Sequence, residues 1–265
     1  MNKYLCIIFS IVICVIAALI YLSNISEKWL VFTSAGNNTE FDKLWTGTHR
    51  KYDIWCVYYG DDETNYNKYK QNVDIIWKRK GSKFQNFSYI YNIYENKINE
   101  YSRVFILDDD IIISTDDINK MFEISRKYNL SICQPAFSEK SKISHQITRV
   151  NKNNILRYTN FVEVNTPLFS QYALNRTMTV YDPSLIGYGI DYLYIWANGL
   201  NHTNKYAIID AITCINPYDD IKNNLRELNQ IKNVHKRAQI WSDYAKRINA
   251  PVSFKQIEYS HIPII

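Results

Sequence analysis

The sequence is poor in the residue clusters that mark zinc-binding and disulfide-rich proteins. Its 265 residues include only five cysteines, and no two of them form a CxxC pair. Cys56, Cys133 and Cys214 each lie in an apolar, strand-like stretch, which favours buried thiols over a disulfide framework or a metal site. The five histidines do not form an HExxH motif, so a zinc hydrolase is not supported.

The chain also lacks a strongly basic segment. Its formal net charge is +5, and Lys78-Arg79-Lys80 is the only tight cluster of basic residues. A dedicated nucleic-acid binder would carry a basic face, so we expect no nucleic-acid partner. Internal repeats, low-complexity tracts and Pro/Gly/Ser-rich linkers are absent too, which predicts a single domain over residues 27–265.

The first 26 residues differ from the rest. No charged residue occurs between Tyr4 and Ser26, and the stretch from Leu5 to Leu22 is almost wholly apolar. As a helix this stretch would measure roughly 27 Å, enough to span the hydrocarbon core of a bilayer. A cleaved signal peptide is the alternative, but its apolar core would be shorter and a small-residue cleavage site would follow it. We therefore expect residues 1–26 to be a membrane anchor and short stalk. The protein would then be a single-pass type II membrane protein, facing the Golgi or endoplasmic reticulum lumen if its source is eukaryotic or viral.

Beyond this segment, short apolar runs alternate with amphipathic stretches. We expect strands at 29–33, 52–59, 74–77, 104–107, 130–135, 208–209 and 212–215, with helices at 41–49, 84–99 and 116–124 and a mainly helical tail at 221–246. This alternation predicts an α/β fold with a mixed, mainly parallel sheet and helices on both faces. Ligands of such sheets bind at the carboxyl ends of the strands, where the turns at Gly36 and Gly60 would lie beside Asp108.

Three consecutive aspartates close the apolar run 104–107. Asp108, Asp109 and Asp110 are followed at once by a second apolar run, 111–113. Adjacent carboxylates at the end of a buried strand repel one another and are costly to desolvate, and a divalent cation bound to a diphosphate would remove that cost. Mg²⁺ and Mn²⁺ are usually held by one or two carboxylates plus substrate phosphates. A solvated turn between two strands is the alternative.

Several short motifs also occur in the order and approximate spacing of one family. They are Val104–Asp110, Ile132–Ala136, Phe161–Ser170, Gly187–Asp191 and Ile209-Asp210. A hydrophobic strand that ends in Asp-x-Asp resembles glycosyltransferases of the A-type fold. The motifs together resemble a glycosyltransferase-A-like family whose plant members are labelled lysine-ketoglutarate-reductase trans-splicing related. The resemblance spans residues 29–216 and implies a Rossmann-like fold, with a divalent ion held against the diphosphate of a nucleotide sugar.

The carboxylate strand and the turns near it supply the candidate ligands. Implied ligands of Mn²⁺ or Mg²⁺ are Asp108, Asp110 and Asn216. The last stands where the family pattern has a histidine, and an amide oxygen is the poorer ligand. Expected contacts of the nucleotide sugar are Asp108, Asp109, Lys80 and Gly36. Asp109 could instead cap the turn, and Lys80, with Lys83 shortly after it, could instead belong to a solvated basic loop.

Two carboxylates are candidates for the chemistry. Asp191 follows Gly187-Tyr188-Gly189-Ile190 and is the expected general base that takes the proton of the acceptor hydroxyl; its alternative role is a helix N-cap. Glu163, a charge inside an apolar run, is the second candidate and would contact the acceptor sugar or face solvent. His145 is expected to be a structural or surface histidine.

The leading hypothesis is a membrane-anchored glycosyltransferase. It would use a metal ion and a nucleotide-sugar donor to glycosylate a glycan, protein or lipid acceptor. The alternative is a catalytically degenerate nucleotide- or carbohydrate-binding protein of the same fold, which the departure at Asn216 suggests.

Overall fold

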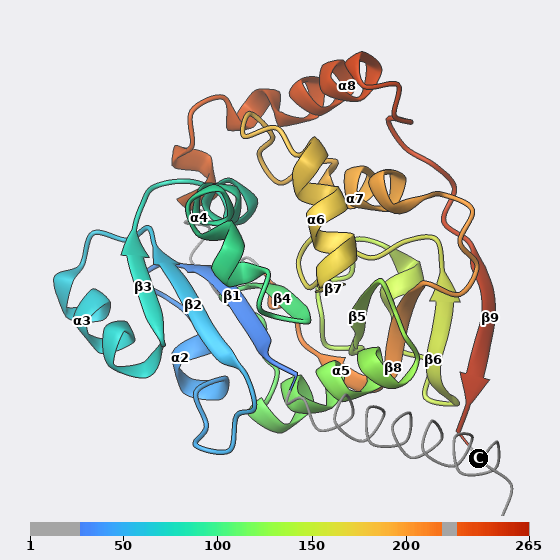
Figure 1. Cartoon of the computed structure of the whole chain (residues 1–265), viewed down its shortest axis with the longest axis horizontal. Coiled ribbons are helices and arrows are strands. Elements are labelled where there is room, and N and C mark those ends of the chain that lie inside the picture. The colour runs from blue at the N-terminus through green and yellow to red at the C-terminus, as the bar shows by residue number, and fades with distance from the viewer. Residues whose placement is uncertain (1–26, 219–226, 265) are drawn as a thin grey trace, which may run out of the picture.

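The computed structural model describes residues 27–218 and 227–264, which form one nine-stranded sheet with helices packed against it (Figure 1). The strands are β1 (Trp29–Ala35), β2 (Asp53–Tyr58), β3 (Ile75–Lys78), β4 (Arg103–Asp108), β5 (Ile132–Phe137), β6 (Asn154–Thr159), β7 (Leu168–Ser170), β8 (Tyr206–Cys214) and β9 (Glu258–Pro263). The helices are α2 (Phe41–Leu44), α3 (Glu63–Asn72), α4 (Lys83–Ile98), α5 (Thr115–Lys127), α6 (Gln171–Val180), α7 (Ile190–Asn198) and α8 (Arg237–Arg247).

The sheet is mixed, as the sequence predicts, but only its first half is parallel throughout. The strand order is β3-β2-β1-β4-β7-β5-β8-β6-β9. β1 runs parallel to β2 and β4, β2 to β3, and β5 to β8. β7 runs antiparallel to β4 and β5, and β6 runs antiparallel to β8 and β9. The expectation of a mainly parallel sheet is therefore wrong for the second half. Parallel neighbours need a long crossover, usually a helix, and no α-helix lies between β5 and β7.

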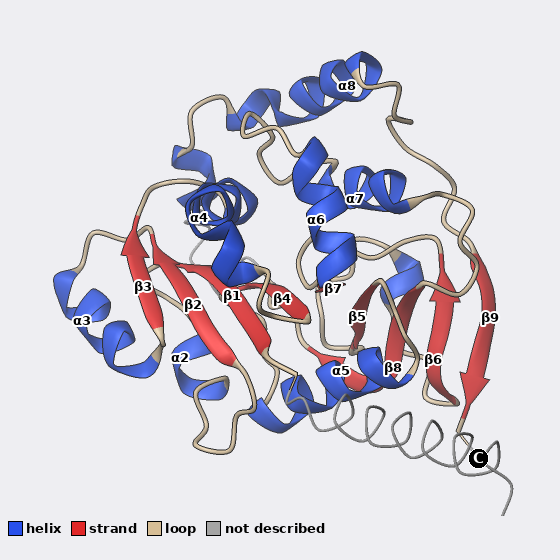
Figure 2. Ribbon diagram, in the orientation of Figure 1, coloured by secondary structure: helices blue, strands red, loops and turns tan. Residues whose placement is uncertain are grey.

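Helices cover both faces of the sheet, as expected (Figure 2). Side chains of α4, α6, α7 and α8 pack on one face, and those of α2, α3 and α5 pack on the other. The central strand β1 contributes to both cores, with Leu30 and Phe32 in the first and Trp29 and Val31 in the second. Successive strand residues point to opposite faces, so a strand covered on both sides reads as a continuous apolar run.

The segment after the aspartates differs from the alternative in which Asp108, Asp109 and Asp110 form a turn between two strands. Residues 111–113 do not form a second strand, since the only pairing there is an isolated bridge between Ile112 and Ile215. Helix α5 begins after Ser114, whose Oγ accepts the N–H of Asp117 at 3.1 Å. Asp116 and Asp117 thus occupy the first turn, where carboxylates interact favourably with the helix dipole, and the cap is the serine.

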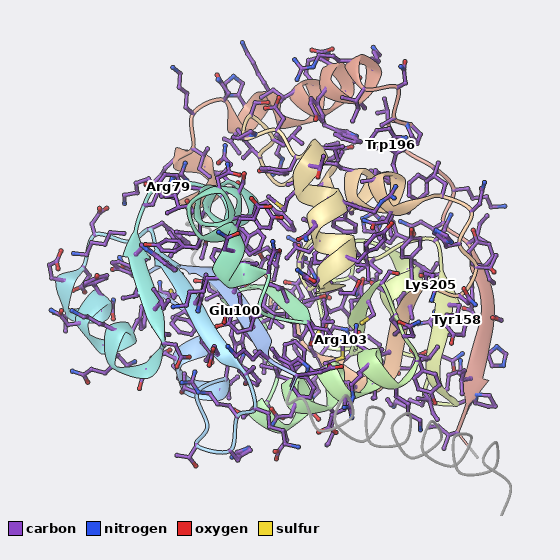
Figure 3. All side chains as sticks on the ribbon, in the orientation of Figure 1. Arg79, Glu100, Arg103, Tyr158, Trp196 and Lys205 are labelled. Atoms are coloured by element: carbon purple, nitrogen blue, oxygen red, sulfur yellow. The ribbon has the colours of Figure 1, made fainter. Side chains whose placement is uncertain are left out.

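A buried arginine fixes the strand that carries the aspartates. Arg103, labelled in Figure 3, begins β4 and donates from Nη1 to Ser125 Oγ at 2.9 Å and to the carbonyl oxygen of Leu130 at 3.0 Å. Both acceptors belong to the end of α5 or the turn that follows it. The first residue of β4 is therefore tied to α5, while its last residue, Asp108, enters the candidate site.

The expected membrane anchor lies outside the described residues. Among residues 27–218 and 227–264, no helix has the length and hydropathy needed to cross a bilayer. Cys56, Cys133 and Cys214 are free and buried, which confirms the expectation of buried thiols.

Gly189 sets the position of α7, the helix that carries Asp191. It has φ of 83°, and a Cβ placed on it would lie 2.2 Å from the indole ring of Trp241 in α8. Gly187 has φ of 73°, and a Cβ placed on it would have no neighbouring atom within 4 Å. Both glycines thus adopt a left-handed backbone, but only Gly189 is also in close contact with a neighbouring helix.

We predict that Gly189→Ala destabilises the protein more than Gly187→Ala. Both substitutions carry a left-handed backbone cost of roughly 1–2 kcal/mol, and overpacking against Trp241 adds about 1–3 kcal/mol to the first. Urea unfolding of the two variants measures the difference. Equal losses would show that the contact between α7 and α8 is looser than the structure indicates.

Candidate functional site

The turn after β1 meets the end of β4, and Asp109 joins them. Its Oδ2 accepts the N–H of Gly36 at 2.9 Å, and its carbonyl oxygen accepts the Thr39 hydroxyl at 2.6 Å and the N–H of Glu40 at 2.9 Å. This is the turn-capping role considered for Asp109. The amide of Gly36 is used within the protein, so the expected contacts of Gly36 and Asp109 with a nucleotide stay predictions.

A buried lysine neutralises Asp108. Lys83 begins α4, and its Nζ lies 2.9 Å from Asp108 Oδ1 with only 9% of the side chain exposed. The same ammonium donates to the carbonyl oxygens of Val164 at 2.7 Å and Asn165 at 2.9 Å, with that of Ile106 at 3.3 Å. Its three N–H groups are therefore occupied by three close oxygens. Burial lowers the pKa of Lys83, and the charge of Asp108 opposes that shift.

Lys80 occupies a different environment from Lys83. Its Nζ lies 2.7 Å from Asp61 Oδ2 in a pair whose side chains are both exposed. The structure thus places Lys80 on the loop between β3 and α4, facing solvent, and places Lys83 against the carboxylate strand. The contact of Lys80 with a diphosphate stays a prediction.

Glu163 lies in the interior of the site. It is 3% exposed, so the solvent-facing alternative is wrong. Its backbone N–H donates to Gln134 Oε1 at 2.5 Å, its Oε1 accepts from Asn165 Nδ2 at 3.2 Å, and its Oε2 has no hydrogen-bond partner. Burial raises the pKa of Glu163 to about 8, and the charges of Asp191 and Asp108 add to the rise.

Asp191 belongs to the first turn of α7 and does not cap that helix. The N-cap is Gly189, so the capping alternative is wrong. Asp191 is 7% exposed, and its Oδ1 accepts the N–H of Tyr192 at 3.1 Å. Burial raises the pKa of Asp191 to about 7, with the hydrogen bond from Tyr192 acting in the opposite direction. A carboxyl group with a pKa near neutrality is suited to exchange protons at physiological pH.

His145 lies beside Asp191 and not on a remote surface. Its Nε2 is 4.0 Å from Asp191 Oδ2, and its Nδ1 is 2.7 Å from Gln256 Nε2. The ring packs against Phe161 with centroids 4.5 Å apart. Burial lowers the pKa of His145. Because the Gln256 amide donates to Nδ1, the neutral ring carries its proton on Nε2, towards Asp191.

Asn216 is brought towards the aspartates by the chain segment that precedes it. Ile215, the residue before Asn216, forms an isolated antiparallel bridge with Ile112, which lies two positions after Asp110. Asn216 donates from Nδ2 to the carbonyl oxygen of Lys142 at 3.2 Å and accepts the Lys142 N–H at 2.8 Å on its own carbonyl oxygen. The side-chain Oδ1 is thus the atom that could act as a ligand.

The protein alone does not provide a complete metal site in the part of the chain that the structure describes, where no three His, Cys, Asp or Glu side chains are grouped to hold an ion. Asp108 has one carboxylate oxygen against Lys83 and is 37% exposed on its side chain. Oxygen donors of this kind fit Mg²⁺ or Mn²⁺ only when substrate phosphates supply the remaining ligands. The donor set is therefore compatible with an ion that binds together with a diphosphate.

Two further residues of the site could not be selected from the sequence. Lys83 and Lys80 are equivalent in a basic loop until the start of α4 is known. His145 lies far from the other site residues in sequence, and only the tertiary fold brings it to Asp191. Gln134 and Asn165 were detectable in principle, because they are part of the motifs Ile132–Ala136 and Phe161–Ser170.

The sequence matches one family model over part of its length. Residues 40–160 match a model described as "Protein of unknown function (DUF707)". No curated protein gives a significant match.

Solved structures with a similar fold are more informative. S. aureus TarS 1-349 in complex with UDP-GlcNAc is 11% identical, with a TM-score of 0.56, and the match covers 85% of this chain and 68% of that one. GalNAc-T7 with UDP, GalNAc and Mn²⁺ is 13% identical, with a TM-score of 0.50 and coverage of 86% and 52%. A further structure of S. aureus TarS is 12% identical, with a TM-score of 0.51 and coverage of 83% of this chain.

The chain spans 43% of the length of that TarS structure. At these identities the likeness shows the fold alone. The described chain has a mixed α/β fold similar to that of GT-A glycosyltransferases.

Proposed function

We propose that the protein is a membrane-anchored glycosyltransferase that moves a sugar from a nucleotide-sugar donor to a glycan, protein or lipid acceptor, and that it belongs with the glycosyltransferase-A-like family its motifs resemble. The main supporting observation is that Asp108, Glu163 and Asp191, from distant parts of the sequence, lie close enough for the charges of Asp108 and Asp191 to act on Glu163, with Lys83 paired to Asp108. Structural neighbours crystallised with UDP-GlcNAc, and with UDP and Mn²⁺, support a donor of this class.

The topology supports a nucleotide site beside β1 and β4. The chain places β2 and β3 on one side of β1 and then returns to place β4 on the other side. The strand order therefore reverses at the boundary between β1 and β4. Crevices at such switch points, beyond the carboxyl ends of the strands, are the usual ligand sites of open α/β sheets. Gly36 and Asp109 lie on the turns at this point, after β1 and β4. Lys80, on the loop after the edge strand β3, would pair with the diphosphate from that side of the sheet.

Asp108 and Asp110 would bind a Mn²⁺ or Mg²⁺ ion together with the diphosphate, with Asn216 Oδ1 as a weaker third ligand. The ion would neutralise the charge that develops on the departing diphosphate. Lys83 would hold Asp108 in place and fix the loop of Glu163 through the carbonyl oxygens of Val164 and Asn165.

Asp191 would act as the general base. It is buried, and burial raises its pKa to about 7, so it can take up and release a proton near neutral pH. His145 faces Asp191 Oδ2, and the hydrogen bond from Gln256 sets the orientation of that ring. Asp191 would take the proton of the acceptor hydroxyl as that oxygen attacks the anomeric carbon of the donor sugar.

A non-catalytic nucleotide- or sugar-binding protein of the same fold is the second candidate. Two features favour it: Asp108 is already paired with Lys83, and Asn216 offers an amide oxygen where the family pattern has a histidine. Both would weaken the binding of a metal ion and would still leave room for a nucleotide.

Calorimetric titration of the full-length protein with nucleoside diphosphates and nucleotide sugars, with and without Mn²⁺, tests the donor site. Release of the nucleoside diphosphate from a bound nucleotide sugar then separates a transferase from a binding protein. Binding without any release would favour the second candidate.

A further inference from the structure

Glu163 has an unusual position for an ionised carboxylate. It is 3% exposed, and its Oε2 is buried without a hydrogen-bond partner. The hydroxyls of Ser144 and Thr148 lie close enough to lower the pKa of Glu163, but neither satisfies Oε2, and the Thr148 hydroxyl donates to the His145 carbonyl oxygen at 2.7 Å. A buried polar atom without a partner costs roughly 1–3 kcal/mol, so a partner for Oε2 is missing from the protein alone.

Among the residues that the structure describes, the cation near Glu163 is Lys83, and its N–H groups are already used by other oxygens. The nearby ammonium of Lys83 already faces Asp108 Oδ1 at 2.9 Å and the carbonyl oxygens of Val164 and Asn165 at 2.7 and 2.9 Å. The other titratable groups around Glu163 are acidic or neutral; they are Asp191 of α7, Asp108 of β4, Tyr194 of α7 and Cys214 of β8. The negative charges of Asp191 and Asp108 disfavour a third charge on Glu163, and Lys83 is already paired. Glu163 is therefore favoured in its neutral form.

The hydrogen bond from Asn165 determines which oxygen carries the proton. Asn165 Nδ2 donates to Oε1 at 3.2 Å, so Oε1 is the acceptor and the proton of the neutral carboxyl group lies on Oε2. The partnerless atom is therefore a hydrogen-bond donor that requires an acceptor oxygen. The surrounding loop is fixed by Lys83 and by Gln134, which accepts the Glu163 N–H at 2.5 Å, so the donor is held in place before any ligand arrives.

The location of this donor identifies the part of the ligand it would meet. Glu163 is affected by the charge of Asp108, at the diphosphate end of the proposed site, and by that of Asp191, at the acceptor end. During transfer, the group between the departing diphosphate and the general base is the transferred sugar. We propose that neutral Glu163 recognises the sugar of the donor nucleotide by donating a hydrogen bond from Oε2 to a sugar oxygen. This inference rests on the proposed function and makes Glu163 a specificity-determining residue in place of a second catalytic acid or base.

The test compares two variants of the full-length protein at pH 7. Glu163→Gln keeps a neutral donor of nearly the same shape, and Glu163→Ala removes it. The ligands are UDP-glucose, UDP-galactose, UDP-GlcNAc and GDP-mannose, with UDP and GDP as sugar-free controls. For the sugar nucleotide that the wild type binds best, we expect about a tenfold loss of affinity in Glu163→Ala, the loss of one hydrogen bond, and less than about a threefold change in Glu163→Gln. Affinity for the sugar-free nucleotide should be the same in all three proteins.

Stability measured without ligand provides an independent readout. The pKa of Glu163 is raised from an ordinary value of 4.5 to about 8, so the unfolded chain releases this proton well below the pH at which the folded protein does. Its contribution to stability is complete below about pH 4.5 and is lost as the pH rises to about 8. Glu163→Gln should therefore raise the unfolding midpoint, relative to the wild type, more at pH 8 than at pH 5.

Distinct results would overturn this proposal. Equal losses of sugar-nucleotide affinity in Glu163→Gln and Glu163→Ala, or an equal loss for UDP, would show that Glu163 does not act as a neutral donor to the sugar. The same conclusion would follow if Glu163→Gln gave no greater stabilisation at pH 8 than at pH 5. If the folded wild type bound none of these nucleotides, the proposed function itself would fail and the role of Glu163 would fail with it, whatever the stability data.

Discussion

Asp191→Asn is expected to lower the rate of sugar transfer by about 10²- to 10⁴-fold, the usual contribution of a positioned general base. The asparagine keeps an oxygen for the Tyr192 N–H, which Asp191 Oδ1 accepts at 3.1 Å, so the fold and the affinity for the donor should not change. Because burial raises the pKa of Asp191 to about 7, the wild-type rate should increase with pH through that value. The variant should show no such increase.

The matched control for this variant is Asp116→Asn. Asp116 also lies in the first turn of a helix, α5, but its side chain is exposed and its partner is His49 at 2.9 Å. Its substitution should leave the transfer rate within about twofold, as for other surface changes away from the site. A rate for Asp191→Asn within about threefold of the wild type would show that another group accepts the proton, and His145 would be the next to test.

Lys83→Met is expected to destabilise the protein by roughly 3 kcal/mol. Removing one member of a buried ion pair leaves an uncompensated charge, at a usual cost of about 3–5 kcal/mol. The lower end applies because Asp108 keeps 37% of its side chain in contact with solvent. The carbonyl oxygens of Val164 and Asn165 would lose a donor as well. Urea unfolding at pH 7 measures the change.

Two further variants identify the cause of that loss. Lys83→Met combined with Asp108→Asn removes the uncompensated carboxylate and should recover part of the stability. Lys80→Met disrupts only the exposed pair with Asp61 and should change stability by less than about 0.5 kcal/mol. If both lysine variants lost the same small amount, the buried pair would have no special importance for the fold.

Much of the fold could be predicted from the chain because its central strands are buried on both faces. The apolar runs 29–33 and 104–107 fall within β1 and β4, and the helix expected at 84–99 is α4 with its bounds shifted by one residue. The reversed strands were less visible. β7 has only three residues, and its antiparallel pairing is set by tertiary contacts with β4 and β5, not by its own pattern.

The site could be predicted only where a local sequence motif marks it. Asp108, Asp191 and Glu163 each occur in a short recognisable motif, and the structure places all three near one another. The choice between Lys80 and Lys83 could not be made from sequence, since it depends on which lysine lies at the inward-facing start of α4. The partner of Asp191, His145, is supplied by the loop between β5 and β6, which has no pattern of its own.

The most direct test of the account is the titration of the full-length protein with nucleotide sugars in the presence and absence of Mn²⁺, together with the variant Asp108→Asn/Asp110→Asn. Asparagine keeps an oxygen for Lys83, so this variant should fold. The control is Asp116→Asn/Asp117→Asn, which neutralises two acidic residues at the start of α5. We expect Mn²⁺-dependent binding of at least one nucleotide sugar that is lost in the first variant and kept in the second. Absence of nucleotide binding by folded wild-type protein, or binding that survives the loss of both aspartates, would contradict it.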